Sequence, residues 1–245
     1  MRLPRLITML LASGVTVLIA AILLSTLPAS AATERAAYAS PSNDGWRYTS
    51  HASPASTGRV LELYVDRDFT DYERQSLLSA MRQWNYVLNG FVQFRARTLP
   101  DDPNPAMISQ LRRSGAWVVA RVDSRHPVAR QGEGTHALAV TTGNRGGFVY
   151  VISDRIGNRD LTGVIMHEFG HVLGAGHDGY GLMAPVYSAA MGRCIDQDAV
   201  ALVARAQRLP MNQLNWCEGP GASPNLPMAR AGSTDYRTPM ATRQR

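Results

Sequence analysis

The chain predicts an α+β fold, and three observations carry that prediction. Short segments rich in β-branched and aromatic residues alternate with longer segments of helical periodicity. Recognisable N-capping residues precede the helical segments. The length of 245 residues, 45% of them hydrophobic, leaves room for one domain of modest size with tails at both ends.

Five segments have the composition of strands. They are short, apolar and bounded by turn residues, and they cover residues 60–65, 91–97, 116–122, 137–142 and 148–152. The fourth segment lies among many glycines and gives the weakest signal. Residues 100–105, with Asp101 and Asp102, are expected to form a solvated loop.

Three segments have the signature of helices. Thr70 and Glu73 have the spacing of a capping box, so a helix should begin at residue 71 and bury one apolar stripe. Asp160 is placed to cap a second helix over residues 161–173. Asp196 or Asp198 would cap a last helix that ends near residue 208. The stripe of the first helix comprises Leu77, Met81, Trp84 and Leu88.

The two ends of the chain differ in composition from the middle. Arg2 and Arg5 precede a long apolar run, and Ala29-Ser30-Ala31 follows it, which is typical of a secretory signal peptide over residues 1–31. The run is also long enough to be an uncleaved N-terminal membrane anchor. Residues 32–57 are expected to be a flexible lead or short pro-segment, 58–217 the domain, and 218–245 a disordered tail.

The formal charge of +6 does not indicate a nucleic-acid partner. All 25 basic residues are arginine, and within residues 58–217 they nearly balance the acidic side chains. No dense basic stripe occurs there, so nucleic-acid binding is not expected.

The most informative segment is residues 167–177, which reads H-E-x-x-H-x-x-G-x-x-H. His167 and His171 are four residues apart, so on a helix both rings lie on one face and can reach one ion. Gly174 can end the helix in a left-handed conformation, which lets the chain return His177 to the same ion. The spacing therefore predicts a zinc site with three imidazole ligands.

Three protein ligands leave one coordination position open, which is typical of a catalytic zinc ion. Zinc in such a site lowers the pKa of a bound water towards about 7 and polarises a carbonyl. Glu168 lies beside the first ligand, where it can take a proton from that water and later deliver it to a leaving amine. The predicted reaction is metal-assisted hydrolysis of an amide bond.

With these residues the chain resembles the metzincin zinc endopeptidases, in which the long motif is followed by a methionine turn. The candidate turn contains Met183, which the resemblance implies lies beneath the metal. The segment Leu182-Met183-x-Pro185-x-Tyr187 is most similar to the matrixin branch, which implies that Pro185 and Tyr187 line a substrate pocket. Pro185 stands where other branches have a metal-facing tyrosine, so no tyrosine ligand is expected.

The resemblance also implies the architecture of the domain. It implies a metzincin-like catalytic domain with a twisted, mixed five-stranded sheet, two long helices, and a small C-terminal subdomain that holds a third helix. The segment 137–142 would be the antiparallel edge strand beside the cleft, where an extended substrate could add through backbone hydrogen bonds.

Two features of matrixins are missing from this chain. No cysteine precedes Cys194, so a pro-segment cysteine cannot cap the zinc. The acidic, glycine-rich loops that hold structural Ca²⁺ in matrixins are also not obvious, so a structural Ca²⁺ ion is possible but no clear motif supports it.

Three further polar residues have open roles. His136 could bind a second metal, although a surface imidazole is favoured, and His126 is assigned no role. Asp178 is equally compatible with orienting a ligand and with forming a turn.

Cys194 and Cys217 are the chain's two cysteines, and an oxidising compartment would allow them to bridge. Such a disulfide would tie the segment after the methionine turn to the end of the last helix. Closing a loop of that size stabilises a fold by about 3 kcal/mol in the chain-entropy description. Two free thiols are the alternative.

These observations predict a secreted, monomeric zinc metalloendopeptidase whose partner is a protein or peptide substrate. Three alternatives stay open: a non-catalytic zinc-binding module, a zinc amidase that acts on cell-wall cross-links, and a membrane-anchored processing enzyme with its catalytic domain outside. Membrane association is expected only if the N-terminal segment stays uncleaved.

Overall fold

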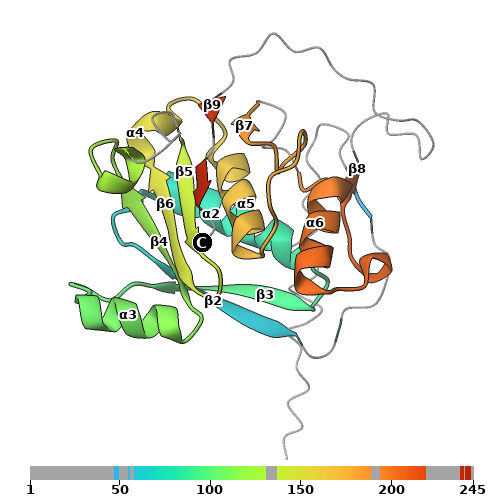
Figure 1. Ribbon diagram of the computed structural model, residues 1–245, viewed down its shortest axis with the longest axis horizontal. Coiled ribbons are helices and arrows are strands. Elements are labelled where there is room, and N and C mark those ends of the chain that lie inside the picture. The colour runs from blue at the N-terminus through green and yellow to red at the C-terminus, as the bar shows by residue number, and fades with distance from the viewer. Residues whose placement is uncertain are drawn as a thin grey trace, which may run out of the picture. The chain divides into compact units, whose positions relative to one another are not determined.

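The computed structural model describes residues 47–49, 55, 58–130, 137–188, 194–218, 238–239 and 241–243 (Figure 1). Six strands form its main sheet: β2 (Arg59–Val65), β3 (Val92–Thr98), β4 (Trp117–Val122), β5 (Ala139–Gly143), β6 (Gly147–Ile152) and β10 (Ala241–Arg243). The helices are α2 (Asp71–Val87), α3 (Pro105–Arg113), α4 (Ser153–Ile156), α5 (Leu161–Val172) and α6 (Gln197–Gln207), with short 3₁₀ turns η1 (Pro127–Arg130) and η3 (Met211–Gln213).

The sheet is mixed, with the order β10-β5-β6-β4-β2-β3. Strands β3, β2, β4 and β6 run parallel to one another, whereas β5 is antiparallel to β6. The five predicted strands are therefore confirmed, and β5 is antiparallel as the resemblance implied, but it is not the edge strand that was expected, because another strand pairs outside it. Strand β10 is an addition from the C-terminal segment, and it pairs in parallel with β5.

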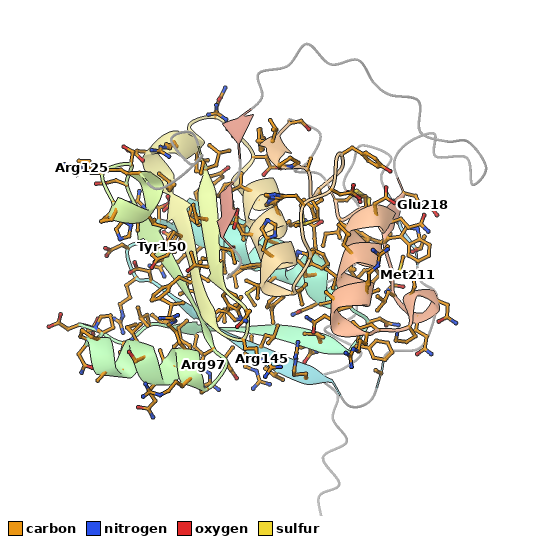
Figure 2. The ribbon with its side chains drawn as sticks, viewed as in Figure 1. Arg97, Arg125, Arg145, Tyr150, Met211 and Glu218 are labelled. Atoms are coloured by element: carbon orange, nitrogen blue, oxygen red, sulfur yellow. A yellow bond between two sulfur atoms is a disulfide. The ribbon has the colours of Figure 1, made fainter. Side chains whose placement is uncertain are left out.

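Alternate residues of the strands face two helices, α2 and α5, which also pack against each other. The core combines Leu63, Val65, Phe94, Trp117, Val119, Val149 and Val151 from the strands with Leu77, Trp84, Ile165 and Phe169 from the helices. This period-two burial is what a sheet covered on one face requires. The other face carries Phe148 and Tyr150 of β6, whose ring centroids stack 5.1 Å apart; Figure 2 labels Tyr150.

Helix α2 begins as its sequence predicts. The Thr70 side chain accepts from the backbone N–H of Glu73, and the Glu73 carboxylate accepts from the backbone N–H of Thr70, which completes a capping box. The indole N–H of Trp84 donates a buried hydrogen bond of 2.9 Å to the carbonyl of Met166. Trp84 therefore fixes α2 against the middle of α5, the helix that carries the histidine motif.

Helix α3 is a correction to the sequence prediction, which placed only a loop before β4. Asn104 caps it by accepting from the N–H of Met107, and Pro105 occupies its first turn. No residue of α3 is fully buried, but Met107, Ile108 and Leu111 form a partly buried apolar side. The cap, the proline and this apolar side were the available signals.

The C-terminal subdomain contains α6, and Asp196 rather than Asp198 is its N-cap. A disulfide joins Cys194 to Cys217, as predicted. Cys217 lies in the short strand β8 (Cys217–Glu218), which pairs with β1 (Arg47–Tyr48). The disulfide therefore links the start of α6 to a small two-stranded sheet, and the other strand of that sheet, β1, precedes β2 in the sequence.

The predicted signal or anchor segment, residues 1–31, lies outside the described residues. Among those that are described, no helix is both long and apolar enough to cross a bilayer. The predicted disordered tail also lies largely outside them. Its exceptions are Glu218 and the two short strands β9 (Thr238–Pro239) and β10.

Candidate metal centre

Helix α5 holds the first two histidines of the motif on one buried face. Asp160 caps the helix by accepting from the N–H groups of Thr162 and Gly163. His167 and His171 follow one turn apart, and their Nε2 atoms lie 2.9 Å apart. Both residues are almost fully buried, at 0% and 3% exposure. The helix therefore presents two imidazole nitrogens to a single point.

The helix ends so that the third histidine joins them. Gly174 adopts φ = 88°, and its N–H donates to the carbonyl of His171 at 2.8 Å. The N–H of Ala175 donates to the carbonyl of Gly170 at 2.9 Å, and the chain turns back. The ring centroid of His177 then lies 4.8 Å from that of His171, and one ligand atom from each of the three histidines lies within 4.8 Å of the others.

Backbone carbonyls fix the orientation of the two buried rings. The Nδ1 of His167 lies 2.7 Å from the carbonyl oxygen of Leu182, and the Nδ1 of His171 lies 2.8 Å from that of Ala175. A carbonyl oxygen only accepts, so each Nδ1 carries the hydrogen, and each Nε2 keeps a free lone pair. This is the arrangement that orients histidine ligands in metal sites.

Burial also keeps these rings in their ligand form. Desolvation lowers the pKa of His171 to about 4 and that of His167 well below its ordinary value. Desolvation also lowers the pKa of His177, which is the exposed member. At neutral pH all three are therefore neutral imidazoles. Zinc–nitrogen distances of about 2.0–2.1 Å place tetrahedral ligand atoms roughly 3.3 Å apart. The three imidazoles suit zinc chemically, and their ligand atoms, within 4.8 Å of one another, need only small movements to reach that spacing.

Glu168 is fully buried beside this cluster. Its Oε2 accepts a 2.5 Å hydrogen bond from Thr141 Oγ1 of β5. Within the described part of the chain, its Oε1 is the one buried side-chain polar atom without a hydrogen-bond partner. Burial raises the pKa of Glu168 to about 8, against the opposing effect of the Thr141 hydrogen bond, so with no cation beside it the carboxyl group is mostly protonated at neutral pH. A cation held by the neighbouring histidines would lower this pKa and favour the carboxylate. The carboxyl group is therefore held at one oxygen and left free at the other.

The methionine turn lies directly beneath α5. Met183 is 1% exposed, and a Cβ added to Gly170 would come within 2.4 Å of its Sδ. Only glycine at position 170 allows this approach. The turn is held from both sides. Asp178 donates its N–H to the carbonyl of Met183 at 2.8 Å, and Asp196 Oδ2 accepts from the N–H of Leu182 at 2.7 Å.

The two predicted pocket residues follow the turn. Tyr187 is buried in β7 (Val186–Tyr187), and its hydroxyl accepts a 3.0 Å hydrogen bond from the N–H of Asp160. The strand β7 is thereby attached to the N-terminus of α5. Pro185 is exposed beside it. The structure places Tyr187 against the N-terminus of α5, and the role of both residues in a substrate pocket stays a prediction.

Within the part of the chain that the structure describes, His126 and Asp178 do not join the cluster. His126 accepts from the N–H of Val128 and stacks on Tyr150, away from α5. His136 lies outside the described residues. Asp178 accepts from the N–H of Gly179 at 2.6 Å, which favours the turn role over the ligand-orienting role. Among the described residues, the three histidines form the one cluster that could hold a metal ion.

The sequence did not identify Thr141, Gly170 or Asp196 as parts of the site. Thr141 contacts Glu168 across 27 residues of sequence, so no local pattern reveals it. Gly170 gave a usable signal, because a glycine in the interior of a helix costs stability and usually has a packing reason. Asp196 was predicted as a cap, but its second hydrogen bond to the methionine turn depends on tertiary structure.

Comparison with known proteins finds a distant structural similarity. No protein-family model matches the chain, and neither does any curated protein. Among solved structures, the chain is similar to high choriolytic enzyme 1 (HCE-1), a hatching-enzyme zinc protease from the medaka fish Oryzias latipes. The identity is 20% and the TM-score 0.31, over 53% of this chain and 50% of that chain. The chain thus spans about half the length of that enzyme, and a likeness this small carries no argument about activity.

Proposed function

We propose that this protein is an exported zinc-dependent endopeptidase of the metzincin type, most similar to the matrixin branch. One observation carries the proposal. Three neutral imidazoles converge beside a buried carboxylate that has one oxygen held by Thr141 and the other free. A structural zinc site has no need of such a carboxylate, whereas metal-assisted hydrolysis requires a base at that place.

His167, His171 and His177 would hold the ion. A zinc ion bound by three imidazoles supplies Lewis acidity, which lowers the pKa of a water and polarises the scissile carbonyl. Glu168 Oε1 takes one proton from the attacking water as the new carbon–oxygen bond forms. It returns that proton to the leaving nitrogen as the carbon–nitrogen bond breaks. Thr141 keeps the carboxylate in one orientation through both transfers.

Strand β5 is the proposed binding edge for an extended peptide substrate. It is the antiparallel strand of the sheet, it packs against α5, and the edge that it turns away from β6 pairs with β10. A peptide that adds to such an edge gains main-chain hydrogen bonds, and its side chains enter pockets on either side. Met183 would support the metal from beneath, and Pro185 and Tyr187 would shape the pocket for the residue after the cleaved bond.

The proposed location is outside the cytoplasm, with residues 1–31 as signal peptide or membrane anchor. The disulfide between Cys194 and Cys217 supports this location, because such bridges persist in oxidising compartments. We also propose that the enzyme acts as a monomer, and that residues 32–57 form a lead or pro-segment.

The decisive experiment compares Glu168→Gln with Glu62→Gln in the full chain. Both changes replace one carboxylate by an amide of the same shape, but Glu62 pairs with Arg97 on the surface. Glu168→Gln should retain one zinc per chain and lose cleavage of denatured casein by at least about 100-fold, the range of a lost general base. Glu62→Gln should cleave like the parent.

The alternatives give different results in the same assay. A non-catalytic zinc module would bind zinc and show no chelator-sensitive cleavage of casein. A cell-wall amidase would leave casein intact and digest peptidoglycan. A parent chain that cleaves casein while Glu168→Gln cleaves it equally fast would contradict the assignment of the base.

A further inference from the structure

The C-terminal segment of the chain pairs with two strands that contact α5, the helix that carries His167 and His171. Strand β9 is antiparallel to β7, with Thr238 opposite Tyr187 and Pro239 opposite Val186. Strand β10 is parallel to β5, with Thr242 opposite Thr141. Figure 1 shows this segment in red beside β5. Neither pairing was predicted, because the composition of residues 218–245 favoured a disordered tail.

Both partner strands are tied directly to the site. Thr141, at the centre of β5, donates the hydrogen bond to Glu168, and Thr242 is its partner in the sheet. Tyr187 of β7 accepts from the N-cap of α5, and Thr238 is its partner. The segment therefore engages two backbone positions whose side chains position the proposed general base and the helix of the metal ligands.

The two pairings form one continuous run. A single residue lies between β9 and β10 in sequence, and two residues of extended chain span at most about 7 Å. The segment thus passes from the strand after the methionine turn to the outer edge of the sheet in one short crossing.

The outer edge of a strand offers one row of N–H and C=O groups, so it can pair with one chain at a time. We propose that residues 238–243 bind the surface formed by β5 and β7 as an intramolecular competitor of the peptide substrate. This inference rests on the proposed function for the identity of the competing ligand. The pairing itself does not depend on that function.

The size of the pairing suits a reversible competitor. Strand β10 pairs through three residues and β9 through two, and Pro239 has no N–H to donate. Such a contact is weak for a free peptide, but a tether raises the local concentration of the segment to the order of millimolar. A substrate must then displace it, and the apparent KM rises by the inverse of the fraction of chains whose edge is open.

The first test compares the chain ending at residue 237 with a matched control ending at residue 243. The control removes only Gln244 and Arg245, which lie beyond both pairings. With a quenched fluorescent peptide that the parent cleaves, the shorter chain should show a KM lower by about 5-fold or more and an unchanged kcat. Equal KM values for the two chains would overturn the inference and leave the proposed function intact.

The second test keeps the full length and does not need activity. Thr242→Pro removes the central N–H of β10, and Ser233→Pro places a proline in the same tail outside the paired residues. Hydrogen exchange of the β5 amides should be faster in Thr242→Pro and in the shortened chain than in the parent and Ser233→Pro. Identical β5 exchange in all four proteins would overturn the inference.

The two tests separate the possible failures. If no chain cleaves any peptide while β5 exchange still changes with the tail, the pairing stands and the proposed function fails. If exchange changes but KM does not, the segment binds without competing, and the inference is overturned as stated.

Discussion

Thr141 and Glu168 come from different elements and meet through the buried hydroxyl of Thr141 in β5, which donates to Glu168 Oε2 of α5 at 2.5 Å and also lies 3.4 Å from the Glu168 carbonyl oxygen. Thr141 is 2% exposed and Glu168 is fully buried. A carboxylate in this position can rotate about its side-chain bonds unless one oxygen is held. The bond to Thr141 leaves Oε1 as the oxygen that can exchange a proton.

We therefore expect Thr141→Val to lower kcat by about 10- to 100-fold and to leave zinc content unchanged, because the change removes positioning of the base and no metal ligand. The variant keeps the shape and β-branching of the side chain. Steady-state kinetics with a peptide substrate and metal analysis provide the measurement.

Thr141→Ser should restore most of this activity, since it restores the hydroxyl. Thr142→Val is the neighbouring control, because alternate residues of a strand face opposite sides of the sheet. If Thr141→Val and Thr142→Val have the same kinetics, the positioning role of Thr141 is wrong.

The contact between Gly170 and Met183 makes a second prediction. Gly170→Ala places a methyl group 2.4 Å from the Sδ of Met183, so the methionine side chain must shift. We expect Gly170→Ala to lower the free energy of unfolding by about 1–3 kcal/mol, the usual cost of overpacking a core, and to weaken zinc binding. Chemical denaturation and a competitive zinc chelator measure the two effects.

Gly176→Ala is the matched control within the same motif, since a Cβ there meets no atom within 4 Å. A double variant, Gly170→Ala with Met183→Ala, removes the obstacle and should cost less than the sum of the single changes. Strict additivity of the two changes would show that Gly170 and Met183 do not contact each other as described.

A third prediction concerns stability in acid. Burial acts to raise the pKa of Glu73, but hydrogen bonds from Thr70 and Arg121 outweigh it and hold the pKa below its ordinary value of 4.5. A carboxyl whose pKa is lowered by folding contributes stability above its unfolded pKa, and that contribution disappears as the pH falls through the folded pKa.

The parent should therefore lose stability steeply below about pH 4.5, the ordinary glutamate range, and Glu73→Gln should flatten that dependence. At neutral pH the variant should be less stable by about 1 kcal/mol, since it weakens a helix cap. Glu62→Gln, at a more exposed carboxyl, is the comparison. Urea denaturation from pH 3 to 7 measures these slopes, and parallel curves for the parent and Glu73→Gln would contradict the prediction.

Local sequence patterns were sufficient for most of the elements. The capping box of Thr70 and Glu73 is local chemistry, and the structure forms it as expected. Asp160 at the start of α5 and Gly174 just after its end could be recognised for the same reason. Helix α3 was missed although its sequence carries a cap at Asn104, a proline in the first turn and a short apolar side.

The candidate site likewise contains some residues that local sequence predicts and others that only tertiary packing brings together. Four-residue spacing on a helix brings His167 and His171 together, so the sequence was enough for that pair. Thr141 and the carbonyl of Leu182 reach the site through the tertiary packing of β5 and of the methionine turn. No local pattern specifies such contacts. The pairing of β10 with β5 is also non-local, and the composition of the tail gave no sign of it.

The most direct test of the central claim is the metal content of the purified chain, with His177→Ala and His126→Ala as a pair. His177 belongs to the cluster, whereas His126 stacks on Tyr150 elsewhere. We expect one zinc per chain in the parent and in His126→Ala, and a zinc affinity at least about 10-fold weaker in His177→Ala, because that variant loses one ligand. A parent chain that binds no transition metal, or a His177→Ala variant that binds zinc as tightly as the parent, would contradict this expectation.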